Sequence, residues 1–388
     1  MAERFAPDGR LEIAYHAYNL SLDEEGRFMI SVTRFATLGV AFFSLVGFSL
    51  GCGKKEAPAT DGPAASAAAP VTATGPITLQ GSGASFPAPL YSRWFREFGD
   101  KNKDIRVNYQ STGSGAGIKA FIAGQTDFGA SDAAMTDDEI KEAKGNVILL
   151  PMTAGNIVLA YNLEGVTDLK LSREVYAGIF LGTIKTWNDP KIATTNPGAK
   201  LPKLNISVVH RSDGSGTTFV FTQHLAAINE KWKSGPGVGK SVEWPVGVGG
   251  AKNDGVAAQI QQTPGAIGYI EFAFAASTKQ PSALLENKAG KFVAPSLKGS
   301  ASALAAVELP PDMRAWVTDP AGDDSYPIVT YTWILAHKKY DDKAKSAALK
   351  SVLKWSLTDG QKLSEGLFYV PLPEAVASNV LKAVDTIE

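Results

Sequence analysis

Short apolar runs bounded by turn residues recur along the body of the chain. They predict β-strands at 77–80, 105–109, 127–130, 147–150, 157–161 and 206–209. Segments between these runs have helical spacing, and the clearest repeats at i, i+4, i+7 and i+11 in Phe221, Leu225, Ile228 and Trp232. Strand, turn rich in glycine and serine, and helix alternate in this order, which predicts an α/β fold.

The N-terminal part has a different pattern. Residues 35–50 are apolar and uncharged. This run is short for a bilayer-spanning helix of about 20 residues but suits the apolar region of a signal peptide. Arg34 supplies a small positive region if translation starts at Met29. We therefore predict a signal peptide at 29–51, with residues 1–28 either not translated or an unstructured extension. A genuine cytoplasmic extension is the alternative.

Cys52, the single cysteine of the chain, directly follows this segment. The arrangement resembles a bacterial lipoprotein signal, which is cut before a cysteine that then becomes lipid-modified, although a chance cysteine is the alternative. Residues 52–76 are rich in alanine and proline and predict a flexible tether. The protein is thus expected in the periplasm or at the cell surface, anchored to a membrane through Cys52.

Length and composition narrow the possible functions. The 388 residues are enough for two domains or one two-lobed domain. Lys and Arg together number 38 against 39 for Asp and Glu, which argues against nucleic acid as a partner because such binding needs a basic excess. A single cysteine excludes an internal disulfide, and four histidines leave little for a zinc cluster. We expect no metal and no cofactor.

Common catalytic motifs are incomplete. The sequence has no G-x-S-x-G elbow, and GPGVGKS at 235–241 is one residue short of a P-loop. GSGASF at 81–86 and GSGAGI at 113–118 lack the sixth-position glycine of a dinucleotide-binding loop. His210 and His224 have no companion metal ligand at short spacing. The chain is therefore predicted to be a binding protein and not an enzyme.

Three clusters of small and hydroxyl residues precede predicted helices, at 82–85, 111–117 and 214–218. A helix start has unpaired N–H donors and a partial positive charge, and small residues let an anion approach them. Arg211 lies beside the third cluster, and Asp132 ends a fourth strand. Because ligands bind beyond the carboxyl ends of strands in α/β sheets, we predict a site for one small oxyanion. Ordinary helix capping, and an exposed Arg211 paired with Asp213, are the alternatives.

These residues resemble those of the phosphate-binding proteins of bacterial high-affinity (Pst-type) phosphate ABC importers. The resemblance covers 77–388. It is carried by GSGASFPAP (81–89), YQSTGSGAG (109–117), TDFGASDAAMTDDE (126–139), RSDGSGTTFVFT (211–222), GGAKNDGVA (249–257), PGAIGYIEFAFA (264–275) and YPIVTYTWILAHK (326–338). It implies the two-lobed periplasmic-binding-protein fold of type II, with a ligand cleft between the lobes. The two crossover strands are expected near 152–155 and 269–274, with 77–153 plus 271–388 as lobe I and 154–270 as lobe II.

The resemblance also implies a set of phosphate-binding residues. Carried over position by position, they are Ser85, the Phe86 N–H, Ser114, Asp132, Arg211, Ser215, Gly216 and Thr217. Asp213 matches the carboxylate that orients the arginine. The implied partners are inorganic phosphate and the permease subunits of a phosphate ABC importer, and the protein is expected to be a monomer.

Within this resemblance, Asp132 matches the buried carboxylate that accepts the proton of phosphate. Sulfate and molybdate have no such proton, so the carboxylate would reject them, and sites of this kind can discriminate by roughly 10⁴–10⁵-fold. Two other functions stay open: a secreted phosphate-ester hydrolase with Ser85 or Ser114 as nucleophile, and a membrane-anchored phosphate sensor.

Overall fold

The computed structural model divides the chain into two compact units, Met1–Val71 and Thr72–Glu388. It describes residues 75–305 and 307–388, together with four short strands near the N-terminus. Of these, β1 (Glu3–Phe5) pairs with β2 (Leu11–Ile13), and β3 (Leu20–Leu22) pairs with β4 (Phe28–Ile30), both antiparallel. The predicted apolar region at 35–50, Cys52 and nearly all of the tether lie outside the described residues, so these assignments stay predictions.

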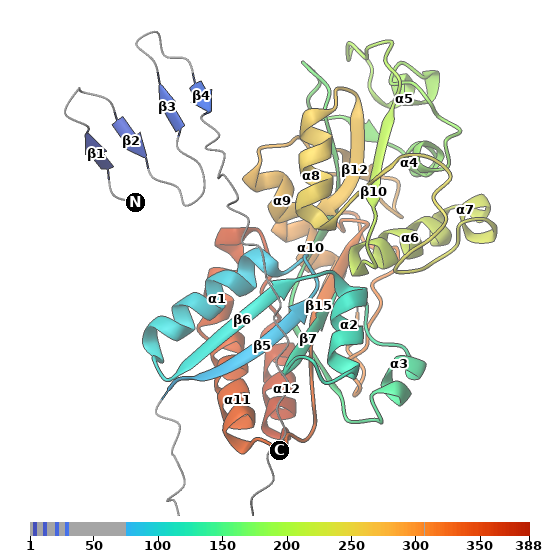
Figure 1. Ribbon diagram of the computed structural model, residues 1–388. Helices are drawn as coiled ribbons and strands as arrows, with labels where there is room; N and C mark the ends of the chain where they lie inside the picture. The colour runs from blue at the N-terminus through green and yellow to red at the C-terminus, as the bar shows by residue number, and fades with distance from the viewer. Residues whose placement is uncertain (1–2, 6–10, 14–19, 23–27, 31–74, 306) are drawn as a thin grey trace, which may run out of the picture. The chain divides into compact units, whose positions relative to one another are not determined.

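An eight-stranded mixed sheet forms the centre of the second unit (Figure 1). Its order is β11-β10-β12-β8-β15-β7-β5-β6. The strands are β5 (Ile77–Gly83), β6 (Ile105–Ser111), β7 (Phe128–Ser131), β8 (Ile148–Tyr161), β10 (Ser207–Arg211), β11 (Val248–Gly250), β12 (Ala266–Glu271) and β15 (Val329–Ala336). The α/β fold predicted from the sequence is confirmed.

β8 belongs to two groups of strands. Residues 148–156 pair with β15, which leads on to β7, β5 and β6, whereas residues 157–161 pair with β12, which leads on to β10 and β11. The pattern of apolar residues predicts two separate strands here, at 147–150 and 157–161. They are one strand because the intervening residues 151–156 are buried and stay paired with β15, although they are less apolar. One continuous strand therefore connects the two groups.

Helices cover both groups of strands (Figure 1). Those before β10 are α1 (Ala88–Lys101), α2 (Ser114–Ile122), α3 (Asp137–Glu142), α4 (Arg173–Phe180) and α5 (Pro190–Thr195). Those after it are α6 (Gly216–Ile228), α7 (Glu230–Ser234), α8 (Lys252–Gln262), α9 (Phe272–Ser277), α10 (Leu297–Ala305), α11 (Lys343–Leu357) and α12 (Glu374–Asp385). Among the described residues, no helix combines the length and the apolar character that a bilayer crossing requires.

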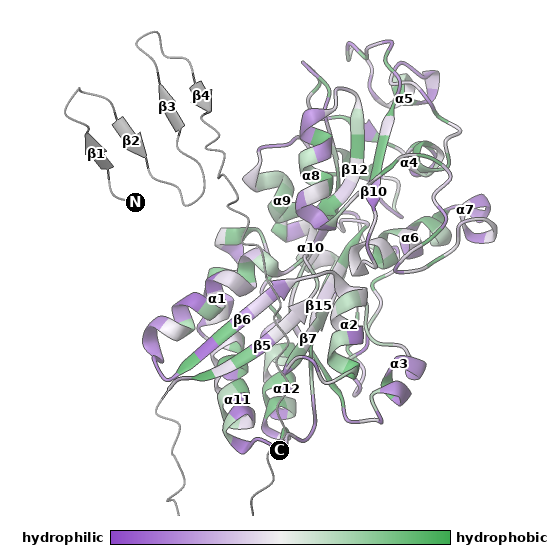
Figure 2. Ribbon diagram, in the orientation of Figure 1, coloured by the Kyte–Doolittle hydropathy of each residue, from purple (hydrophilic) through white to green (hydrophobic). Residues whose placement is uncertain are grey.

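The helices follow from alternation of apolar and polar residues. In α1 the buried residues are Leu90, Tyr91, Trp94, Phe95 and Phe98, which lie on one face. Figure 2 shows hydrophilic and hydrophobic residues mixed along α1, α8 and α11, as expected for helices with one buried side. The predicted helical repeat ending at Trp232 is interrupted, because Asn229 ends α6 and its Oδ1 accepts the Trp232 N–H at 3.0 Å to begin α7.

The segment after β12 pairs with strands of the second group before the chain reaches β15. β13 (Leu284–Glu286) pairs with β9 (Lys170–Leu171) and with β14 (Phe292–Val293) in a separate three-stranded sheet. Residues 271–388 were assigned to the first lobe, yet Leu285 is buried next to Leu171, and Ser282 bridges to Ala160 on the second half of β8. Residues 282–286 therefore pack with the second group.

Candidate functional site

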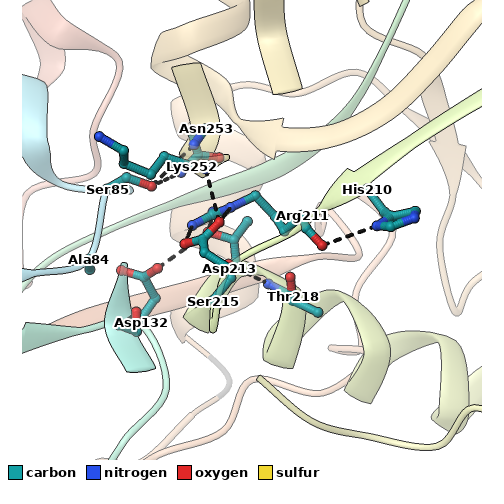
Figure 3. Close-up of polar contacts among 12 residues, drawn as sticks. Ala84, Ser85, Asp132, His210, Arg211, Asp213, Ser215, Thr218, Lys252 and Asn253 are labelled. Atoms are coloured by element: carbon teal, nitrogen blue, oxygen red, sulfur yellow. Dashed lines mark hydrogen bonds and ion pairs between the residues drawn. The ribbon is translucent and has the colours of Figure 1, made fainter. Parts of the chain in front are cut away.

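The predicted oxyanion residues meet where the strands of the two groups end. Ser85 follows β5, Asp132 follows β7, and Arg211 is the last residue of β10. All three residues are buried, with 2%, 2% and 4% of their surface exposed. Figure 3 shows them converging with Asn253 and Asp213. A ligand here would be removed from water, which strengthens every charge and hydrogen bond around it.

Arg211 and Asp213 form a bidentate ion pair. The Arg211 Nε–H donates to Asp213 Oδ1 at 2.8 Å, and Nη2 donates to Oδ2 at 2.6 Å. Burial would raise the pKa of the Asp213 carboxyl, but the hydrogen bonds and charge of Arg211 outweigh it and hold this pKa below its usual range. The pairing expected of an exposed arginine is thus present, but Arg211 is buried, and its Nη1 donates to Thr217 Oγ1 at 3.4 Å.

Within residues 75–305 and 307–388, the carboxylate of Asp132 accepts hydrogen bonds from hydroxyl groups only. Thr332 Oγ1 donates to Oδ1 at 2.9 Å, and Thr217 Oγ1 donates to Oδ2 at 3.3 Å. Burial raises the pKa of the Asp132 carboxyl to about 7, against the lowering effects of these two hydroxyls, of Arg211 and of Ser114. The Asp132 carboxylate is therefore expected to take up a proton near neutral pH.

The start of α6 lies against Asp132 and Ser114. The N–H of Gly115, in the first turn of α2, donates to the Gly214 carbonyl at 2.8 Å and ties α2 to the loop before α6. A Cβ at Gly216 would lie 2.7 Å from Ser114 Oγ and 2.8 Å from Asp132 Cβ, so only glycine allows this approach. The N–H groups of Gly216 and Thr217 belong to the first turn, where no carbonyl of the helix can accept from them.

Ser215 is the N-cap of α6. Its Oγ accepts the Thr218 N–H at 3.0 Å, and its own N–H donates to the Lys240 carbonyl at 2.8 Å. The Ser215 hydroxyl therefore stabilises the helix start, and only its O–H proton is left to donate to a ligand.

The loop after β5 is tied to the start of α8. Ser85 Oγ accepts from the Asn253 N–H at 3.2 Å and from Asn253 Nδ2 at 3.0 Å (Figure 3). Asn253 Oδ1 in turn accepts the Glu271 N–H at 3.0 Å. Phe86 is buried and its carbonyl accepts the Tyr369 O–H at 2.6 Å. Its own N–H has no hydrogen-bond partner within 75–305 and 307–388, which leaves it as a donor.

Comparisons with known proteins agree with this arrangement. The PBP superfamily domain matches residues 64–360. A phosphate-binding protein PstS of Pasteurella multocida is 43% identical over 307 residues, covering 78% of this chain and 88% of the relative. A phosphate-binding protein PstS of Methanocaldococcus jannaschii is 38% identical over 339 residues, covering 80% and 87%. The chain belongs to the PstS family of phosphate-binding proteins. The resemblance stated from the sequence is confirmed.

Solved structures of the same fold are more distant in sequence. A high affinity periplasmic phosphate-binding protein (PfluDING) bound with phosphate has a TM-score of 0.65 at 21% identity, covering 78% of this chain and 93% of that chain. A phosphate binding protein from Stenotrophomonas maltophilia has a TM-score of 0.62 at 18% identity, covering 79% and 93%. They support the two-lobed fold expected from the sequence.

Two residues that contact the site, Asn253 and Thr332, were not predicted from the sequence. Asn253 lies within GGAKNDGVA, which carried part of the resemblance to the PstS family without any residue in it being assigned a role. Thr332 lies on β15, where Thr330 and Thr332 point to the same face because side chains alternate along a strand. Thr330 Oγ1 lies 3.3 Å from the Asp132 carbonyl. The alternation of threonine with aromatic residues at 330–333 was the available signal.

The two histidines considered as ligands lie apart from this shell. His224 Nε2 is hydrogen-bonded to Tyr176 Oη at 2.8 Å, and burial lowers the pKa of its imidazole to about 4. His210 stacks on Trp244, with ring centroids 4.9 Å apart. Within the part of the chain that the structure describes, no group of three potential metal ligands is close enough to hold an ion. The described shell offers the Arg211 guanidinium paired with Asp213, several neutral donors, and the Asp132 carboxylate as an acceptor.

Proposed function

We propose that the protein binds inorganic phosphate with high affinity and delivers it to the permease subunits of a membrane ABC importer. The observation that supports this most is the buried bridge from Arg211 through Thr217 to Asp132. In this bridge a cation, a hydroxyl and a carboxylate surround one water-excluded point. Its relatives in the PstS family are named phosphate-binding proteins.

The proposed phosphate contacts divide by charge. Arg211 supplies the positive charge. Its Nε and Nη2 are paired with Asp213, and its Nη1 is directed away from that carboxylate. The neutral donors are of two kinds. The backbone donors are the N–H of Phe86 and the first N–H groups of α6, including that of Gly216. The side-chain donors are the hydroxyls of Ser85, Ser114, Ser215 and Thr217. Many neutral dipoles and one arginine suit a multiply charged anion without needing a basic surface.

Asp132 would decide which oxyanion is bound. A carboxylate can only accept hydrogen bonds, and phosphate at neutral pH has at least one P–OH to donate. Sulfate has no proton, so its oxygens would face those of Asp132 with nothing between them. While the carboxyl group is ionised, a buried mismatch of this kind can reject an analogue by roughly 10⁴-fold.

Calorimetric titration of the purified protein, without its signal and tether, tests this proposal. We expect tight binding of phosphate and binding of arsenate, because it also has a proton to donate. At alkaline pH, where Asp132 is ionised, we expect no binding of sulfate at equal concentration. Absence of phosphate binding, or equal affinity for sulfate, would contradict the proposal. Phosphate uptake by cells with and without the gene then separates import from a sensing role.

The alternative hydrolase would need an activated serine. Ser85 Oγ accepts from Asn253 and Ser114 Oγ accepts from the Asp132 N–H, and neither has a histidine partner among the described hydrogen bonds. We therefore propose that the protein has no catalytic activity. Turnover of a phosphate ester in the presence of zinc and magnesium would contradict this.

We also propose that the chain is a lipoprotein, anchored through Cys52 and exported by a signal at 29–51. The lone cysteine between an apolar run and an alanine- and proline-rich segment supports this. Cys52→Ser is expected to release the protein as a soluble monomer with unchanged phosphate affinity. Retention of this variant in the membrane fraction would show that the apolar segment itself is the anchor.

A further inference from the structure

Thr332 contacts one of the two carboxylate oxygens of Asp132. It lies on β15, whose eight residues are all buried, and its side chain is fully inaccessible to water. Its Oγ1 donates to Asp132 Oδ1 at 2.9 Å, whereas Oδ2 is the oxygen in contact with Thr217 on the α6 side. The two carboxylate oxygens therefore have different partners, and Oδ2 is the one that contacts Thr217 at the start of α6.

The position of Asp132 alone does not exclude sulfate. A protonated carboxyl group carries an O–H donor, and such a donor satisfies a sulfate oxygen as well as it satisfies phosphate. Rejection of sulfate therefore requires Asp132 to be ionised as well as buried. Whatever holds Asp132 in the ionised form thereby determines selectivity.

Several groups surround this carboxylate. Arg211 on β10 favours the ionised form, and Thr332, Thr217 and Ser114 donate or lie close enough to do so. Tyr91 on α1, Tyr109 on β6, Tyr369 and Glu271 are the other titratable groups whose fields couple to it. Among the influences that lower the pKa of Asp132, the hydrogen bond from Thr332 is the largest. Burial opposes it and brings this pKa close to neutral.

We propose that Thr332 is a positioning residue that keeps Asp132 a hydrogen-bond acceptor, and so sets the pH below which the site begins to bind sulfate. The inference rests on the proposed phosphate function and adds to it the source and the pH limit of its selectivity. Thr332 acts through Asp132 and touches no ligand itself.

Sulfate affinity against pH is the measurement that tests this. Sulfate stays a dianion throughout, so its pH dependence reports groups of the protein alone. In the unaltered protein, sulfate binding should strengthen as the pH falls through about 7, with close to a tenfold gain per pH unit where one proton is taken up. Asp132→Asn should remove this dependence, which separates Asp132 from the histidines.

Thr332→Val removes the hydroxyl at nearly constant volume. The onset of sulfate binding should then move up by about one pH unit, so that sulfate is bound about tenfold more tightly at alkaline pH, where Asp132 of the unaltered protein is almost fully ionised. Thr332→Ser should restore the behaviour of the unaltered protein. Thr330→Val is the matched control, because it lies two residues away on the same face and contacts the Asp132 carbonyl instead of the carboxylate. It should leave the onset where it was.

Two results would overturn the proposal. One is sulfate affinity of the unaltered protein that does not change between about pH 5 and 9, a measurement that needs no variant to fold. The other is a Thr332→Val protein that binds phosphate but keeps the original onset for sulfate. Failure of the phosphate function itself would give a different result, because the unaltered protein would then not bind phosphate at any pH.

Discussion

Asp132 and Asp213 belong to the same site, but the pKa values of their carboxyl groups are shifted in opposite directions. Each follows closely on the end of a strand, β7 for Asp132 and β10 for Asp213. The Asp132 carboxylate receives hydrogen bonds from the hydroxyls of Thr332 and Thr217, and burial raises its pKa to about 7. Asp213 is also partly desolvated, but Arg211 holds its pKa below the usual range. Asp132 therefore takes up a proton readily, whereas Asp213 stays ionised as the counter-charge of Arg211.

This difference shows what can attract an anion here. Once Asp132 is ionised, the two carboxylates outnumber the single guanidinium, so the net charge of the three groups is negative. Attraction must then come from the oriented N–H and O–H dipoles around them, which are set in place before the ligand arrives. The predictions below disturb one side of the comparison at a time.

Arg211→Met breaks the counter-charge side and should have the largest effect. It removes the one guanidinium of the shell and leaves Asp213 without its ionic partner, so phosphate affinity should fall by about 2–5 kcal/mol. Calorimetric titration measures this loss. Arg106→Met, at an exposed arginine of β6, is the control and should bind as the unaltered protein does. Equal affinity of the two variants would mean that Arg211 is not a ligand.

Asp132→Asn changes the acceptor side. The amide can still accept from P–OH and can also donate to a sulfate oxygen, so sulfate should gain about 1–3 kcal/mol of affinity. Asp213→Asn is the matched change on the other side, and it should weaken phosphate binding without admitting sulfate. Competition titrations of the two variants compare them directly. Sulfate exclusion that survives Asp132→Asn would place selectivity elsewhere.

Thr217→Val removes the hydroxyl that lies between the two sides. Phosphate affinity should fall by about 1–3 kcal/mol, because the hydroxyl that accepts from Arg211 and donates to Asp132 is lost and both of these buried groups lose a partner. Ser215→Ala should instead lower the free energy of unfolding by about 1 kcal/mol through loss of the helix cap, with a smaller effect on binding. Titration and urea unfolding of both variants check this division. If Ser215→Ala weakens binding more than Thr217→Val, the division is wrong.

Asn253→Ala should have the smallest effect, about 0.5–1.5 kcal/mol in phosphate affinity. Asn253 makes no proposed contact with phosphate, but its side chain and N–H orient the hydroxyl of Ser85. Asp254→Ala, one residue further along the same helix and exposed, is the control and should leave phosphate affinity unchanged. A loss as large as that of Arg211→Met would instead make Asn253 a principal ligand.

Much of the site was predictable because its sequence signal is local. Glycine, serine and threonine gather at strand ends for reasons of backbone geometry, and they identified the loops that hold Ser85, Ser114 and Thr217. Arg211 and Asp213 are two residues apart, so their pairing was readable as well. The resemblance to a family then supplied the ligand.

Contacts over long separations in the chain were not predictable in this way. Asn253 lies 168 residues from Ser85, and Thr332 lies 200 residues from Asp132. Both pairs depend on how the sheet is assembled, which no local pattern records. The same reason explains β8, because its middle residues resemble a loop in sequence and are held extended by β15.

The position of β15 also determines when the sheet can be completed. It lies between β7 and β8, although β8 ends at Tyr161 and β15 begins at Val329. Until the last part of the chain has been synthesised, β15 is missing from the sheet. The edges of β7 and β8 that pair with it are then unpaired. Adding β15 joins segments far apart in sequence, which makes this addition a slow step of folding. A chain cut short before β15 would expose both edges, and such edges pair readily with other chains.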